Sequence, residues 1–142
     1  MTGFGGLPLE IRCTYLVDTS GTAVLAGDLE AARDYARRAT ELCPFAAVSW
    51  STLATATART DPPTALDAAR RGGRLAPTPE QQWRLGDARL AAGDPDGADD
   101  LAGSAERAPA KLCGRFMGWM ARTRPPGRVS LERARRACEG PR

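Results

Sequence analysis

The chain contains no histidine and only one lysine among its 142 residues. Histidine is the usual general base and a frequent zinc ligand, so its absence excludes Ser-His-Asp triads, Cys-His dyads and metal sites that need imidazole. No apolar run approaches the roughly 18 residues that a membrane-spanning helix needs. We therefore expect a protein without enzymatic activity, without a metal or other cofactor, and outside the membrane.

Alanine is the most abundant residue, at 26 positions, whereas the β-branched residues valine and isoleucine are scarce. Because alanine has the highest helix propensity and strands favour β-branched residues, the predicted fold class is all-α. The length fits a single domain. The segment 1–8 resembles no export signal and reads as a flexible terminus, so the expected location is cytoplasmic. The 19 arginines beside one lysine are typical of a GC-rich bacterial genome.

Prolines and glycines divide the chain into pieces of similar length. A proline cannot continue a helix interior and biases the preceding residue away from the helical region, so each one marks a boundary. On this basis we predict eight helices, over residues 9–26, 29–43, 46–60, 64–76, 79–92, 95–107, 110–123 and 129–139. The segment Thr78-Pro79-Glu80-Gln81 has the pattern of a capping box, in which the threonine hydroxyl and the glutamine side chain each satisfy a free amide.

Small residues recur at a nearly constant interval in every second predicted helix, at positions i, i+4 and i+7. Such residues share one helical face and let a neighbouring helix approach closely. The period of about 33 residues is typical of helical-repeat proteins. The four sets are Ala32, Ala36 and Ala39; Ala65, Ala69 and Gly72; Ala98, Ala102 and Ala105; and Ser130, Ala134 and Ala137.

These repeats resemble the tetratricopeptide repeat (TPR) family, whose pattern of about 34 residues is W-x2-L-G-x2-Y followed by A-x3-F-x2-A-x4-P. The second repeat carries Trp50, Leu53 and Ala54, then small residues that end at Pro77, and the third carries Leu85-Gly86. The family's second aromatic residue is replaced by alanine. The resemblance implies a right-handed α-solenoid of about four antiparallel helix hairpins, with repeats over approximately 11–44, 45–77, 78–109 and 110–141.

In this family the first helix of each hairpin lines a concave surface that binds peptides or partner helices. Counted from the Leu-Gly pair, the partner-binding positions are Glu80, Trp83, Asp87 and Leu90 in repeat three, and Leu112, Arg115, Trp119 and Arg122 in repeat four. Repeat two offers mostly small residues, namely Val48, Ser51, Thr55 and Ala58, followed by Arg59. The alternative for Trp83 and Trp119 is a core or capping role, and Trp50 is expected in the core.

Four cysteines, Cys13, Cys43, Cys113 and Cys138, lack both a CxxC pair and histidine partners, so they do not form a metal site. Cys13 and Cys43 stand at the start and end of the first hairpin, and Cys113 and Cys138 do so in the fourth. Because antiparallel partners bring such positions together, two disulfides are geometrically feasible. Reduced thiols are the alternative in a cytoplasmic protein.

Charge is unevenly distributed along the chain. Residues 1–110 carry 11 arginines and 15 acidic residues, a net charge of −4, whereas residues 111–142 carry nine basic and two acidic residues, a net charge of +7. The basic C-terminal hairpin indicates an alternative role, as a regulatory or nucleic-acid-associated module. No aromatic stacking motif accompanies the arginines, so direct nucleic-acid binding is the weaker expectation.

The preferred prediction is a non-enzymatic adaptor or chaperone that binds a peptide or helix of another protein on its concave face. The carboxylate clamp of chaperone-binding TPR proteins needs lysine and asparagine where this chain has Val17 and Gly21, so that ligand is not expected. Self-association through an exposed solenoid end is a further option, because terminal repeats need a cap.

Overall fold

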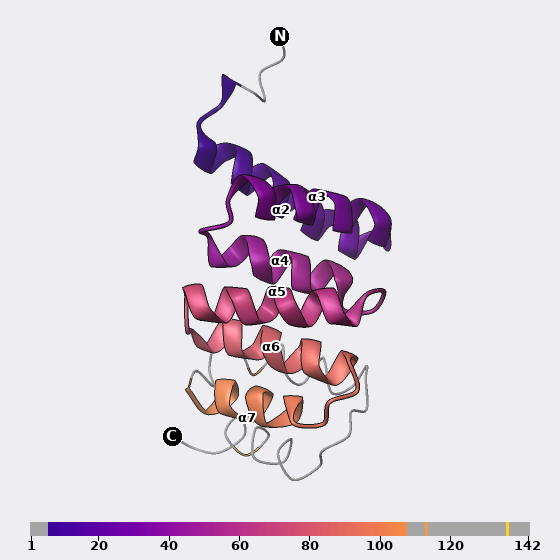
Figure 1. Ribbon diagram of the computed structural model, residues 1–142, viewed down its shortest axis with the longest axis vertical. Helices are drawn as coiled ribbons and strands as arrows, with labels where there is room; N and C mark the ends of the chain where they lie inside the picture. Colours follow the sequence, from indigo (N-terminus) through magenta and orange to yellow (C-terminus); the bar gives the residue numbers. More distant parts are fainter. Residues whose placement is uncertain (1–5, 108–112, 114–135, 137–142) are drawn as a thin grey trace.

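The computed structural model describes residues 6–107, Cys113 and Arg136, and within them all regular structure is helical. This confirms the all-α prediction. Six helices follow one another in chain order: α2 (Leu9–Leu25), α3 (Leu29–Leu42), α4 (Ala47–Thr57), α5 (Pro62–Leu75), α6 (Pro79–Ala91) and α7 (Gly97–Arg107). They stack along the long axis of the molecule (Figure 1). The helices expected over 110–123 and 129–139 lie outside the described residues, apart from Cys113 and Arg136.

The predicted helix boundaries agree with the structure to within a few residues, and the largest differences have local causes. Helix α5 begins at Pro62, two residues before the expected start, because Asp61 caps it and both prolines fit its first turn. The Asp61 carboxylate accepts hydrogen bonds from the Thr64 main-chain amide and hydroxyl, at 3.4 and 2.6 Å. Helix α4 ends at Thr57, three residues early.

The turn between α4 and α5 differs from its counterparts in the other two hairpins. Gly27 and Gly93 occupy the left-handed region there, with φ of 80° and 86°, and end α2 and α6. The equivalent position, one repeat away from each, is Thr60, which lacks the conformational freedom of glycine. Its main-chain amide bonds to the Thr57 carbonyl at 3.1 Å, which tightens this turn.

Only half of the predicted capping box is present at the start of α6. The Thr78 hydroxyl accepts a hydrogen bond from the Gln81 amide at 3.3 Å. The Thr78 amide, however, donates to the Ala76 carbonyl at 2.7 Å and not to the glutamine side chain. The Gln81 side chain packs over Gly72 of α5 instead, where a Cβ would lie 2.6 Å from its Oε1 atom. The reciprocal bond was therefore wrongly predicted.

Successive helices pack as three pairs, α2 with α3, α4 with α5, and α6 with α7, and each pair contacts the next. In addition, α2 contacts α4 and α4 contacts α6, so the first helices of the three pairs form one layer. The small residues predicted for α3, α5 and α7 are buried, which confirms their packing role, whereas Ser130, Ala134 and Ala137 lie outside the described residues. Those with at most 1% exposure are Ala32, Ala36, Ala39, Ala65, Ala69, Ala98, Ala102 and Ala105.

Glycines allow α6 and α7 to approach closely. A Cβ at Gly86 would lie 2.7 Å from the Gly97 carbonyl oxygen and 3.0 Å from side-chain atoms of Asp100 and Leu101. An ion pair between Arg89 and Asp100, with an N···O distance of 2.7 Å, links the same two helices. Partial burial raises the pKa of the Asp100 carboxyl group, against the opposing effect of Arg89.

A disulfide joins Cys13 near the start of α2 to Cys43 at the end of α3, with the Cα atoms 6.3 Å apart. It joins the two residues predicted for the first hairpin. Cys113 is also in a disulfide, and Cys138 lies outside the described residues. Because disulfides persist mainly in oxidising compartments, the bond does not support the expected cytoplasmic location. In the part of the chain that the structure covers, no helix is both long and apolar enough to cross a membrane.

Candidate partner-binding groove

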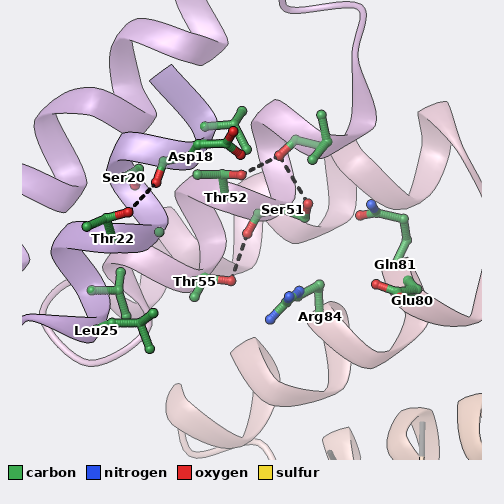
Figure 2. Close-up of a pocket in the computed structure, with 14 residues that line it drawn as sticks. Asp18, Ser20, Thr22, Leu25, Ser51, Thr52, Thr55, Glu80, Gln81 and Arg84 are labelled. Atoms are coloured by element: carbon green, nitrogen blue, oxygen red, sulfur yellow. Dashed lines mark hydrogen bonds between the residues drawn. The ribbon is translucent and has the colours of Figure 1, made fainter. Parts of the chain in front are cut away.

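A groove of about 560 Å³ runs along the layer formed by α2, α4 and α6. All three helices contribute side chains, as Figure 2 shows for Asp18 and Thr22 of α2, Thr52 and Thr55 of α4, and Glu80 and Arg84 of α6. No residue of α3, α5 or α7 in the described part of the chain lines it. The groove is therefore a property of the first helices of successive pairs.

Hydroxyl groups dominate the central part of this groove. Thr52 and Ser51 donate to the Val48 carbonyl at 2.7 and 3.1 Å, and Thr55 donates to the Ser51 carbonyl at 3.0 Å (Figure 2). On α2, Thr22 donates to the Asp18 carbonyl at 3.0 Å. Because each hydroxyl proton is engaged by its own helix, the oxygen lone pairs are what these side chains offer to a ligand.

Charged and apolar groups flank the hydroxyls. Asp18 lies at the α2 side, and Glu80 lies at the α6 side, where Arg84 points into the groove in the direction of Thr55 (Figure 2). Apolar contact surface comes from Leu25 at one end and from Val48, which is 52% exposed. The described lining thus combines hydrogen-bond acceptors, charges of both signs and small apolar patches.

Several positions expected on the concave face do line the groove. They are Val48, Ser51 and Thr55 on α4 and Glu80 on α6, and the clamp positions Val17 and Gly21 on α2 also line it. Asp87 and Leu90 are half-buried on α6 but do not line it. Arg59 is exposed in the turn after α4, beyond the helix. Arg115, Trp119 and Arg122 lie outside the described residues, as does nearly all of the basic segment 111–142.

Trp83 was wrongly predicted to be a groove anchor. Its side chain is only 2% exposed, because α6 packs against α4, α5 and α7. Trp83 stands one full repeat after Trp50, at the same interval that relates the second helices. The structure places Trp50 partly buried against the core, where its Nε1 atom donates to the Pro44 carbonyl at 2.8 Å and Arg71 covers its ring. The core alternative is thus confirmed for Trp83, and Trp50 packs against the core while remaining partly exposed.

Gln81 and Arg84 are the lining residues of α6 that the sequence reasoning missed. Ala32, Ala65 and Ala98 are separated by one constant interval. Adding this interval to the positions of Val48 and Ser51 gives Gln81 and Arg84. The prediction instead aligned Leu85-Gly86 with Leu53-Ala54, which gives an interval that is shorter by one residue. This error turns the inferred face by about 100° around the helix. The regular interval of the second helices was the signal that would have found them.

Within the described ranges, no cluster of three or more metal-ligating side chains is present. Comparison with known proteins finds no matching family model, no matching curated protein and no matching solved structure.

Proposed function

We propose that this protein is a non-enzymatic adaptor or chaperone, built as a TPR-like right-handed α-solenoid, that binds a segment of another protein in its groove. One observation carries the proposal. Side chains from α2, α4 and α6 line a single continuous groove, and the second helices of the same pairs do not. A surface assembled from repeated helices in this way fits an extended or helical segment of a partner.

The chemistry of the groove supports a particular kind of segment. Threonine and serine oxygens with engaged protons accept hydrogen bonds from main-chain amides or from basic side chains. The carboxylates of Asp18 and Glu80 outnumber the guanidinium of Arg84, so the described lining has a net negative charge that attracts a basic side chain, and Leu25 and Val48 receive small apolar side chains. The preferred partner segment therefore carries hydrogen-bond donors and at least one basic residue, with apolar residues between them.

The same hydrogen bonds favour binding over catalysis. A nucleophilic serine or threonine needs a neighbouring base that accepts its proton. Ser51, Thr52 and Thr55 donate instead to main-chain carbonyl groups of their own helix. Their arrangement therefore supports a ligand-binding surface.

The test fills the groove with a large side chain. Thr55→Arg and Thr52→Arg place bulk and positive charge on the groove surface of α4, so both variants should lose the bound partner. Thr14→Arg is the matched control, because Thr14 is exposed on α2 and does not line the groove. Circular dichroism would establish that all three variants keep the helical content of the unmodified protein.

The readout is affinity capture from native cell extract, followed by titration of the captured protein. We expect at least about a tenfold loss of affinity in the two groove variants and wild-type affinity in Thr14→Arg. Equal binding by all forms would contradict the proposal, as would a loss confined to the control.

A further inference from the structure

A second cavity, of about 330 Å³, lies where the end of α5, the start of α6 and the end of α7 meet. Figure 1 shows these three helix ends at the same edge of the molecule. Three arginines line the cavity: Arg70 and Arg74, one turn apart on α5, and Arg107 in the last turn of α7. Below, this cavity is called the arginine pocket.

Arg107 is held in the arginine pocket by two neutral groups. Its Nη1 atom donates to Gln82 Oε1 at 2.9 Å, and its Nη2 atom donates to the Pro77 carbonyl at 3.1 Å. Gln82 is itself packed over Gly103 of α7, where a Cβ would lie 2.6 Å from its Nε2 atom. Neither partner neutralises the guanidinium charge, and the group keeps further N–H donors for a ligand.

The positive charge of the arginine pocket has no acidic counterpart among the described residues that line it. Arg70 and Arg74 form no ion pair within the described part of the chain, although their neighbour Arg71 pairs with Asp67. Thr78, which caps the positive end of α6, also lines the cavity. Three arginines therefore contribute to the lining of one small cavity, and the other described residues that line it are neutral.

The other described residues that line the cavity are uncharged, and they include Leu85, Pro77 and Gly73. The cavity volume lies within the range of small-molecule sites. A ligand that fits such a pocket carries a strongly anionic group for the arginines and a compact apolar body for Leu85 and Pro77.

We propose that the arginine pocket binds the phosphate monoester of a small organic molecule. A phosphate monoester carries a charge between about −1.5 and −2 at neutral pH and three acceptor oxygens. It therefore matches three guanidinium groups better than a carboxylate, which has a single charge and two oxygens. Gln81 lines both this cavity and the groove of α2, α4 and α6, but none of the three arginines lines the groove, so the arginine variants test this site independently of the proposed function.

The experiment is isothermal titration calorimetry at low ionic strength with three probes: phenyl phosphate, benzoate and inorganic phosphate. We expect phenyl phosphate to bind at least about fivefold more tightly than either of the others, because it alone offers both a dianionic group and an apolar ring. Absence of phenyl phosphate binding would overturn the proposal. Equal binding of inorganic phosphate would overturn the assignment of an organic ligand, and equal binding of benzoate would overturn the preference for phosphate.

Four variants test the location of the site. Arg70→Gln, Arg74→Gln and Arg107→Gln each remove one charge, and Gln82→Glu adds an isosteric carboxylate beside Arg107. Each should weaken phenyl phosphate binding by at least about fivefold. Arg59→Gln is the matched control, since it removes the same charge from an exposed turn, and it should stay within about twofold of wild type.

Arg70 and Arg74 are exposed and make none of the hydrogen bonds that join α5 to its neighbours, so their variants should fold normally. Unchanged binding in both variants would overturn the proposal. An equal loss of phenyl phosphate affinity in Arg59→Gln would show that the effect depends only on net charge. That result would also overturn the proposal.

Discussion

Replacement of Gly86 by alanine tests the packing of the last described hairpin. The added Cβ would lie 2.7 Å from the Gly97 carbonyl oxygen and 3.0 Å from side-chain atoms of Asp100 and Leu101. These distances are several tenths of an ångström too short, and the nearest atom belongs to the main chain, so α7 must move away from α6. That movement also disturbs the 2.7 Å ion pair between Arg89 and Asp100.

The expected magnitude is the difference between two opposing effects. Overpacking of a well-packed interface costs about 1–3 kcal/mol, and a clash with main chain belongs in the upper half of that range. Replacement of a helical glycine by alanine raises the free energy of unfolding by about 1 kcal/mol, because alanine has the higher helix propensity. We therefore expect Gly86→Ala to lower the free energy of unfolding by about 1–2 kcal/mol.

Gly21→Ala is the matched control, because Gly21 also lies inside a helix and a Cβ there meets no atom within 4 Å. This variant should gain about 0.5–1 kcal/mol. Urea unfolding followed by circular dichroism measures both changes, and they should have opposite signs. Stabilisation of Gly86→Ala to the same extent as Gly21→Ala would refute the close approach of α6 and α7.

Two further predictions concern the core and the disulfide. Trp83→Ala should lower the free energy of unfolding by about 3–5 kcal/mol, because it removes a large buried side chain, and a near-neutral result in urea unfolding would show that Trp83 is not in the core. Cys13→Ser should cost about 3–4 kcal/mol by the loop-entropy relation, since the bond joins positions with a sequence separation of 30. Peptide mapping without reductant should recover Cys13 and Cys43 in one linked fragment, whereas free thiols at both positions would contradict the pairing.

Much of the fold could be predicted because alanine periodicity and helix boundaries are local signals. The buried faces of α3, α5 and α7 follow from small residues spaced at i, i+4 and i+7, and Asp28, Asp61 and Thr78 accept the capping hydrogen bonds at the starts of α3, α5 and α6. The groove residues of α6 were harder to predict from the sequence. Contacts with three other helices decide which face of α6 points into the groove. A one-residue error in the alignment was enough to predict the buried Trp83 as a groove residue in place of Arg84.

Other features depend on contacts that no local pattern specifies. The pattern Thr78-Pro79-Glu80-Gln81 predicted a reciprocal cap, but Gly72 leaves room that the Gln81 side chain occupies instead. The arginine pocket likewise brings together residues of α5 and α7, which are far apart in the sequence. Neither arrangement can be read from the spacing of residues within one helix.

The most direct test of the central claim is amide hydrogen–deuterium exchange on the protein with and without its captured partner. We predict that binding slows exchange along α2, α4 and α6, at the turns that carry Thr22, Thr52 and Arg84, and leaves α3, α5 and α7 unchanged. Protection confined to α3, α5 and α7 would contradict the assignment of the groove as the binding surface.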